Sequence, residues 1–137
     1  MVQEMVKMKT KIGAIILNNG KILSVRKRDS DIYIMPGGGP EGTENHEETL
    51  KRELKEELNV ESANFKLFDS FVEPAIFEPG NIVAHVYYAD IEGNPEPSSE
   101  IEEVKWLDTT CKNLKIGSVL GERVMPKLIK KRTSAKR

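Results

Sequence analysis

Apolar and polar residues along the chain form patterns that predict several strands and one strongly marked helix. Lys9–Leu17 is apolar and rich in β-branched residues, and it is followed by the tripeptide NNG and then by KILSVRKR. Asn and Gly tolerate positive φ, so this segment is typical of two strands joined by a tight turn. Further strands are predicted from β-prone composition at Ile32–Met35, Phe65–Val72, Ile82–Ile91 and Glu103–Leu107.

The helical pattern is strongest in the segment Asn45–Leu58. Its leucines recur at every fourth position and form one apolar stripe, which consists of Leu50, Leu54 and Leu58. Asn45 is a favourable N-cap, and Glu48 three residues later completes a capping box. Asn59 then suits the left-handed conformation in which many helices end.

The remaining segments are predicted to be loops and a second helix. PGGGPEG, EPAIFEPGN and GNPEPSSE have loop composition. The chain from Ser118 onward has helical character, but proline breaks or kinks helices, so the last helix is expected to begin at about Pro126. The order of strands, helix, strands and helix favours an α/β or α+β layer fold, in which helices pack against a mixed sheet.

Length, composition and charge indicate a single globular domain over residues 1–137. The 137 residues are 38% hydrophobic and 31% charged, which is not the composition of a disordered chain. With 21 basic and 22 acidic residues the net charge is −1, so nucleic acid and anionic membranes are not indicated as partners. The basic end, KKRTSAKR at about residues 130–137, is expected to be frayed.

The cysteine content and the lack of long apolar segments bear on location. Cys111 is the single cysteine and cannot form an intrachain disulfide, which favours a reducing compartment, and we expect the protein to be cytoplasmic. No apolar stretch approaches the roughly 20 residues that span a bilayer. The opening residues, MVQEMVKMKT, have no apolar run of the kind found in secretory signals.

Three glutamates crowd one side of the predicted helix, within the stretch RELKEELNV that begins at Arg52. Helical geometry places Glu57 beside the leucine stripe, Glu53 next to it and Glu56 a little further out. Like charges at these spacings destabilise a helix, and partial burial would raise that cost or raise their pKa. A divalent cation would remove the conflict, because carboxylates are hard oxygen ligands suited to Mg²⁺ or Mn²⁺. The alternative is an ordinary glutamate-rich helix, since glutamate favours helices.

The loop before the helix adds a second feature. Gly37, Gly38 and Gly39 let backbone groups approach a ligand closely, and a glycine-rich turn that opens a helix can cradle phosphate. A flexible turn is the alternative meaning of three glycines. Joined to a carboxylate helix, the loop predicts a site for a metal-bound polyphosphate, in which these glycines contact the substrate.

From Gly38 onward the sequence resembles the Nudix box, G-x5-E-x7-R-E-U-x-E-E-x-G-U, in which U is an apolar residue. The match runs from Gly38 through Glu44 to the stretch RELKEELNV, which ends at Val60. Every specified position fits except the last glycine, which is Asn59 here. Asparagine is the next-best residue for a left-handed helix end, so this departure is mild.

The resemblance implies a Nudix-type α/β/α sandwich around a mixed β-sheet, and hydrolysis of a diphosphate linkage in a nucleoside diphosphate joined to another group. The implied ligands of Mg²⁺, or of Mn²⁺, are Glu53, Glu56, Glu57 and a backbone carbonyl near Gly37 or Gly38. Arg52 and Glu44 are implied to orient these glutamates. We expect Glu53 to take the proton from the attacking water, although some family members use a glutamate from a later loop.

That later loop and one predicted strand hold further candidates. Strand alternation separates Glu102 from Glu103, and we prefer Glu103 as the extra ligand or base, with Glu100 second. A solvated acidic loop is the alternative. Arg26 and Arg28 share a strand face and are candidates for binding substrate phosphates, with a solvated strand edge as the alternative.

Other polar side chains are expected to take no part in catalysis. His85 lies in the middle of a predicted strand and is expected to be packed or paired, whereas His46, in the first helical turn, is expected to be exposed. Cys111 lacks an activating context and is expected to be inert.

The substrate is less well specified than the reaction. The chain is short, like family members that act on (d)NTPs, so a (d)NTP or a modified nucleotide is ranked first. ADP-ribose or another nucleotide sugar is the alternative, because ADP-ribose hydrolases often carry a proline near the position of Pro74. A nucleotide sensor without catalysis is a further alternative, although such proteins typically lose box glutamates. The last alternative is a simple interaction protein whose acidic helix is a surface feature. The protein is expected to be a monomer or a homodimer.

Overall fold

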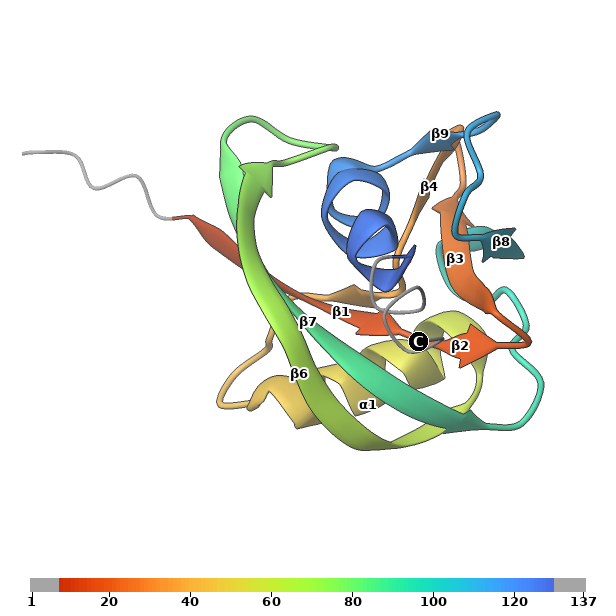
Figure 1. Cartoon of the computed structure of the whole chain (residues 1–137). Helices are drawn as coiled ribbons and strands as arrows, with labels where there is room; N and C mark the ends of the chain where they lie inside the picture. Colours follow the sequence, from red (N-terminus) through yellow and green to blue (C-terminus); the bar gives the residue numbers. More distant parts are fainter. Residues whose placement is uncertain (1–7, 130–137) are drawn as a thin grey trace, which may run out of the picture.

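Two β-sheets and two helices make up the described part of the chain (Figure 1), which in the computed structural model comprises residues 8–129. The first seven residues and the basic segment at about 130–137 lie outside the described residues. The elements in chain order are β1 (Lys9–Ile15), β2 (Leu17–Asn18), β3 (Lys21–Lys27), β4 (Ile32–Ile34), β5 (Gly37–Gly38), α1 (His46–Leu58), β6 (Glu61–Pro74), β7 (Asn81–Glu92), β8 (Ile101–Asp108), β9 (Lys115–Ile116) and the π-helical segment η1 (Val119–Val124).

Each sheet combines parallel and antiparallel pairs. The first has the order β5-β1-β7-β6, in which β1 pairs parallel with β7 and the other pairs are antiparallel. The second is built on β3, which pairs antiparallel with β2, β4 and β8, while β9 adds to β4 in parallel. The predicted α/β class with mixed sheets is therefore confirmed.

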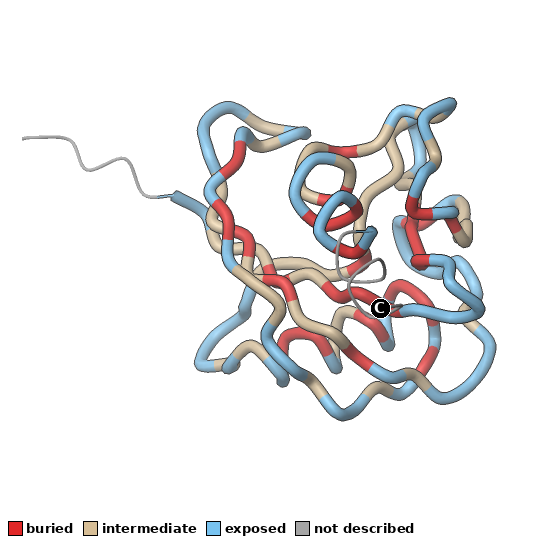
Figure 2. Tube along the Cα trace, in the orientation of Figure 1, coloured by how far each residue is buried: buried red, intermediate tan, exposed pale blue. Residues whose placement is uncertain are grey.

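Both faces of β1 are buried because a helix covers each of them. Ile12 and Ala14 pack into one core with the leucine stripe of α1, whereas Ile15 packs into a second core with Leu120 and Val124 of the second helix. In Figure 1, α1 (yellow) lies below β1 and β7, and the second helix (blue) lies above them. Figure 2 shows the buried residues running through the strands between these two helices. This helix–sheet–helix layering explains why the second half of β1, residues 12–15, has no polar side chain.

The capping of α1 is as predicted. The backbone N–H of Glu48 donates to the Asn45 side chain at 2.8 Å, and the Asn45 N–H donates to the Glu48 carboxylate at 2.9 Å. Asn59 ends the helix in the left-handed conformation, with φ of 56°. The departure from the family's glycine therefore keeps the backbone conformation that glycine would supply.

Several predictions of secondary structure were incomplete or wrong. Gly37–Gly38, expected in a loop, forms the short strand β5 because it pairs with β1. The strand predicted at Phe65–Val72 extends over all of β6, and β9 was not predicted. In β3, Leu23 and Val25 pack into one core and Ile22 into the other, so the two faces alternate as strand geometry requires and both are buried.

The second helix begins well before Pro126, at residue 118, and continues to residue 129. Its first part, η1, is wound in the wider π register, and the Met125 N–H donates to the Leu120 carbonyl five residues earlier. These widened turns lie directly before Pro126, so a residue that lacks an N–H can continue the helix instead of starting it. None of the helices in residues 8–129 has the length and apolar character that crossing a bilayer requires.

Candidate active site

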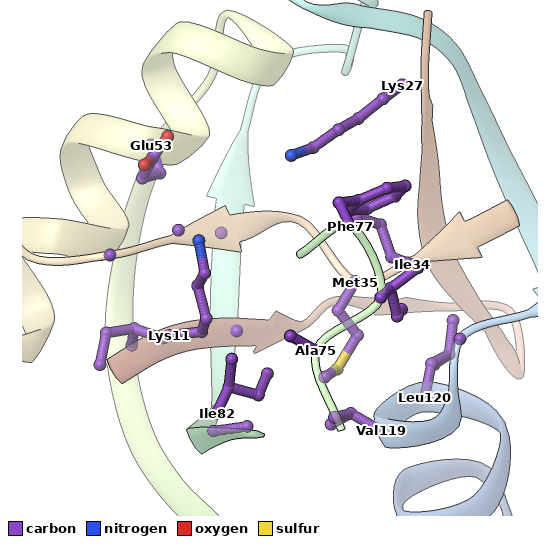
Figure 3. A pocket seen from close by; sticks show the side chains of 18 of the residues that line it. Lys11, Lys27, Ile34, Met35, Glu53, Ala75, Phe77, Ile82, Val119 and Leu120 are labelled. Carbon is purple, nitrogen blue, oxygen red and sulfur yellow. The ribbon is translucent and has the colours of Figure 1, made fainter. Parts of the chain in front are cut away.

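A cavity of about 300 Å³ opens between α1, the short strand β5, the loop at residues 75–80 and the second helix. Charged and apolar side chains divide its wall. Figure 3 shows Glu53, Lys11 and the Lys27 ammonium group toward one side, and Ile34, Val119 and Leu120 toward the other. The charged groups that line the cavity are Lys11, Lys27, Glu53, Glu57, Glu78 and Glu100.

The glycine stretch lies directly beside the acidic face of α1. Strand β5 pairs with β1, with Gly38 opposite Ile12, and this pairing holds the glycines at the cavity wall. A Cβ on Gly38 would lie 1.9 Å from Oε2 of Glu53, and a Cβ on Gly37, where φ is +140°, would lie 1.9 Å from the Ile12 carbonyl oxygen. Side chains are therefore excluded at both positions, which lets the Glu53 carboxylate lie against backbone.

Glu57 has the most perturbed carboxyl group of the cavity. Its residue is 3% exposed, and the Gly37 N–H donates to its Oε1 at 3.1 Å. Burial raises the pKa of Glu57 to about 8, with further contributions from Glu53 and Glu100, while the Gly37 N–H and Lys27 act in the opposite direction. A carboxyl group in this setting is short of partners for its ionised form.

Glu53 lies one helical turn from Glu57 and is half-buried. Burial raises the pKa of the Glu53 carboxyl, which Arg52 lowers and Glu56 and Glu100 raise again. Two neighbouring carboxylates with raised pKa values, both facing one cavity, are typical of functional sites.

Arg52 and Glu44 form a tightly bonded frame behind these glutamates. The Nε of Arg52 donates to Oε2 of Glu44 at 2.7 Å and its Nη2 donates to Oε1 at 3.0 Å. The same Nη2 donates to the Gly39 carbonyl at 3.0 Å, and Nη1 lies 3.4 Å from Oε2 of Glu53. Arg52 thus joins the glycine loop, the Glu44 segment and α1, and it holds the pKa of Glu44 down at about 2.

Glu56 is not among the residues that line the cavity. Its side chain is 52% exposed and lies 3.5 Å from Nη1 of Arg52. The burial order along the helix, from Glu57 through Glu53 to Glu56, agrees with the predicted order beside the leucine stripe. Within residues 8–129, no cluster of three or more histidine, cysteine or acidic side chains has the geometry to hold a metal ion.

Of the two glutamates weighed in the later segment, Glu100 rather than Glu103 lies at the cavity. Glu103 accepts hydrogen bonds from Nε of Arg26 at 3.1 Å and from the Tyr33 hydroxyl at 2.7 Å, and both donors lower its pKa. Because β3 pairs with β8, Arg26 stands directly opposite Glu103. Glu103 is therefore a member of a paired polar cluster on the second sheet.

The cations at the cavity are lysines that sequence reasoning missed. Arg26 bonds to Glu103 and to the Ser30 carbonyl, and Arg28 bonds to the Ser99 carbonyl. Neither arginine is among the residues that line the cavity, whereas Lys27 between them and Lys11 of β1 are. Strand alternation could have signalled Lys27, because neighbours of Arg26 and Arg28 point to the other face.

The two histidines form a small cluster outside the cavity. His85 Nδ1 lies 2.7 Å from the Ser70 hydroxyl, so the prediction of a paired histidine is confirmed. His46 was expected to be exposed but is partly buried, because its ring stacks on His85 at 4.6 Å and its Nδ1 lies 2.7 Å from the Tyr87 hydroxyl. Burial and the neighbouring His46 lower the pKa of His85.

Comparisons with known proteins place this geometry in a family. A family model described as NUDIX domain matches residues 7–111. No curated protein sequence matches the chain. The structure is similar to a MutT NUDIX hydrolase from Burkholderia pseudomallei, with a TM-score of 0.78 and 21% identity over 90% of this chain and 99% of that one.

Two further solved structures show the same likeness. The E. coli ORF135 protein has a TM-score of 0.76 and 23% identity, over 93% of each chain. A UDP-X diphosphatase has a TM-score of 0.77 and 17% identity, over 98% of this chain and 67% of that one. At these identities the likeness concerns the fold.

Proposed function

The chain belongs to the Nudix family, whose members are pyrophosphohydrolases, and we propose that it hydrolyses a diphosphate bond in a (d)NTP or a modified nucleotide with Mg²⁺ or Mn²⁺ as cofactor. One observation carries this proposal. The carboxylates of Glu53 and Glu57 and the ammonium groups of Lys11 and Lys27 line one cavity beside the glycine strand. Such a set of groups can hold a divalent cation and the anionic oxygens of a polyphosphate in the same space.

The donor set fits a hard divalent cation, which Nudix proteins in general use. Glu57 is buried with one backbone N–H as its donor, so its ionised form lacks the partner that a cation would supply. The proposed ligands are Glu53, Glu56, Glu57 and the Gly38 carbonyl. Glu56 would first have to leave its long contact with Arg52. When bound, the cation would neutralise diphosphate charge and lower the pKa of a water molecule.

The substrate's phosphates are proposed to lie between the two lysines and the glycine strand. Lys11 and Lys27 come from β1 and β3 and both line the cavity, so they can contact anionic oxygens from two sides. The glycines allow the phosphates to approach backbone closely. Arg26 and Arg28 are not part of this proposal, because their guanidinium groups are already bonded elsewhere.

Glu53 is proposed to accept the proton of the attacking water. Its raised pKa, caused first by burial, makes it a better proton acceptor at neutral pH than an exposed carboxylate. Glu100 is the second candidate for this role, because it lines the same cavity. Glu103 is withdrawn from it, since Arg26 and Tyr33 already bond to its carboxylate and lower its pKa.

Arg52 and Glu44 are proposed as positioning residues. Arg52 bonds bidentately to Glu44, and it also reaches the Gly39 carbonyl and comes near Glu53. These contacts hold the glycine loop and the acidic face of α1 in one arrangement. Groups of this kind orient metal ligands without touching the substrate themselves.

A nucleotide sugar is the second candidate substrate class, favoured by the fold likeness to a protein named UDP-X diphosphatase. Pro74, which raised the possibility of ADP-ribose, does not line the cavity, although the next residue, Ala75, does. The nucleoside triphosphate class therefore stays first.

A substrate panel tests the proposal. The panel comprises the four dNTPs, an oxidised dGTP, ADP-ribose, diadenosine polyphosphates and sugar nucleotides, each scored by kcat/KM with Mg²⁺. Glu57→Gln serves as the catalytic control, and Glu47→Gln, an exposed change on the same helix, serves as the matched structural control. We expect a nucleotide triphosphate to be cleaved by the native protein and by Glu47→Gln only. Equal cleavage by Glu57→Gln would contradict the proposed site, and preference for a sugar nucleotide would establish the second class.

A further inference from the structure

Among residues 8–129, the wall of the cavity opposite the carboxylates of Glu53 and Glu57 consists mainly of apolar side chains. Six of its residues come from the end of β4 and the residue after it, the loop at 75–80 and the second helix: Ile34, Met35, Ile76, Phe77, Val119 and Leu120. Their side chains are hydrocarbon apart from the methionine sulfur, which is a weak acceptor. Figure 3 shows Ile34, Met35, Phe77, Val119 and Leu120 gathered on this side of the cavity. We call these six residues the apolar wall.

Some backbone groups near the apolar wall already form hydrogen bonds within the protein. The Ala75 N–H donates to the Gly80 carbonyl at 2.9 Å, within the loop that carries Ile76 and Phe77. The Gly117 N–H donates to the Tyr33 carbonyl at 2.9 Å, and the Gly117 carbonyl accepts from Gly121 at 2.8 Å. The two N–H groups are therefore not available to donate to a ligand's polar edge.

The apolar wall is closely packed around Gly117. A Cβ at this position would lie 2.6 Å from Cδ1 of Ile76 and 3.0 Å from Cγ2 of Ile34. The shape of the wall therefore depends on Gly117 having no side chain. A ligand at this wall would be selected by how well its shape fits.

Phe77 links the apolar wall to the charged side. Phe77 is 49% exposed, which is high for a phenylalanine. The Lys27 ammonium nitrogen lies 4.9 Å from the centre of the Phe77 ring, and both residues line the cavity. A planar group stacked on the ring would thus lie near Lys27, which is proposed to contact the phosphates of the substrate.

We propose that the apolar wall binds the nucleobase by outline and stacking and does not read its hydrogen-bonding edge, so that the enzyme discriminates weakly between bases of similar size. This inference rests on the proposed function. A site built to hydrogen-bond a substrate group rejects an analogue without that group by about 10⁴-fold or more, because its own polar groups are left unpaired. The apolar wall has no such groups to leave unpaired, so a base without a polar edge is accepted as well as a natural one.

The experiment compares dTTP with the deoxynucleoside triphosphate of difluorotoluene, which has the outline of thymine but lacks its hydrogen-bonding edge. We expect kcat/KM for the isostere to be within about tenfold of the value for dTTP, or above it. We also expect the four dNTPs to differ from one another by less than about a hundredfold. A loss of about 10³-fold or more for the isostere would overturn the inference.

Binding of the two monophosphates, measured in parallel by calorimetry, separates this inference from the proposed function. If neither triphosphate is hydrolysed but both monophosphates bind with similar Kd, the proposed function has failed and the inference stands. If dTMP binds and the isostere does not, the inference is overturned whatever the hydrolysis assay gives. Failure of both monophosphates to bind would also overturn it.

Two matched pairs of variants sharpen the test. Ile76→Asn places an amide in the apolar wall, and we expect it to create a preference between bases that the native protein lacks. Val72→Asn introduces the same amide at an exposed position of β6 that does not line the cavity, and it should leave the kcat/KM ratios between the dNTPs unchanged. Phe77→Ala should raise KM for dTTP and for the isostere by a similar factor, about tenfold, while Phe77→Tyr restores both. An effect of Phe77→Ala on dTTP alone would contradict readout by stacking.

Discussion

Glu57 and Glu44 belong to the same loop-and-helix unit, yet their carboxyl groups sit in opposite electrostatic settings. Glu44 accepts two charge-assisted hydrogen bonds from Arg52, and its pKa falls to about 2. Glu57 is buried with one backbone donor, and its pKa rises to about 8. The contrast separates a carboxylate that stabilises the scaffold from one whose ionised form still lacks a partner. In a Nudix protein, the second kind is where a divalent cation is expected.

The largest effect should come from removing the buried Glu57 carboxyl, whose one hydrogen-bond donor is the Gly37 N–H. We expect Glu57→Gln to lower kcat/KM by about a hundredfold to a thousandfold or more, because Glu57 is a proposed ligand of the divalent cation that would stabilise the transition state. The fold should persist, because the amide fills the same volume. Thermal unfolding of the metal-free protein should show equal or higher stability, as a buried ionisable group is removed. A large drop in melting temperature would assign Glu57 a structural role instead.

The second effect comes from breaking the scaffold pair. Arg52→Gln should lower kcat/KM by about tenfold to a hundredfold and also lower the melting temperature, because Glu44 and Gly39 lose their donor. Arg52→Lys keeps the charge but lacks the planar guanidinium group, so its kcat/KM and melting temperature should lie between those of the native protein and those of Arg52→Gln. Activity equal to the native value in Arg52→Gln would contradict the positioning role.

The two carboxyls should also respond to pH with opposite sign. The pKa of Glu57 is raised from 4.5 to about 8, so the folded metal-free protein holds a proton that the unfolded chain releases. Its contribution to stability is full below about pH 4.5 and is lost as the pH rises through about 8. The pKa of Glu44 is lowered from 4.5 to about 2, so its contribution is present above pH 4.5 and is lost as the pH falls through about 2.

Urea unfolding in the presence of a chelator measures this difference. Between about pH 5 and pH 8 the free energy of unfolding of Glu57→Gln should fall less with rising pH than that of the native protein. Glu44→Gln should lower the free energy of unfolding above about pH 4.5 and should change its slope with pH only on the acid limb. Identical pH profiles for native protein and Glu57→Gln would show that Glu57 titrates normally.

The smallest effect distinguishes the lysine at the cavity from the arginine beside it. Lys27→Met should raise KM for the nucleotide by about tenfold, with a smaller change in kcat, since it removes a proposed phosphate contact. Arg26→Met should leave KM nearly unchanged, because Arg26 bonds to Glu103 and to the Ser30 carbonyl away from the cavity. The reverse result would restore Arg26 as the substrate-binding residue.

Local sequence signals predicted α1 well. The capping box of Asn45 and Glu48, the leucine stripe and the left-handed Asn59 all depend on residues within a few positions of one another. The order in which the acidic residues are buried along the helix was also predictable, because it follows from helical geometry alone.

Features that depend on pairing between distant segments were not predicted. Gly37–Gly38 became a strand because β1 lies beside it. Glu103 was preferred over Glu100 because nothing in the sequence shows that β3 and β8 bring Arg26 opposite Glu103. The start of the second helix was missed because the π turns before Pro126 are a tertiary accommodation rather than a local preference.

The most direct test of the central claim is a calorimetric titration of the metal-free protein with Mg²⁺ and Mn²⁺, without nucleotide. We expect saturable binding by the native protein and by Glu47→Gln, and strongly weakened binding by Glu57→Gln. Protons should be released on binding near pH 7, because Glu57 must ionise to bind the cation. Equal binding by the native protein and Glu57→Gln, or no binding by either, would contradict the proposal that the buried Glu57 carboxyl is a metal ligand.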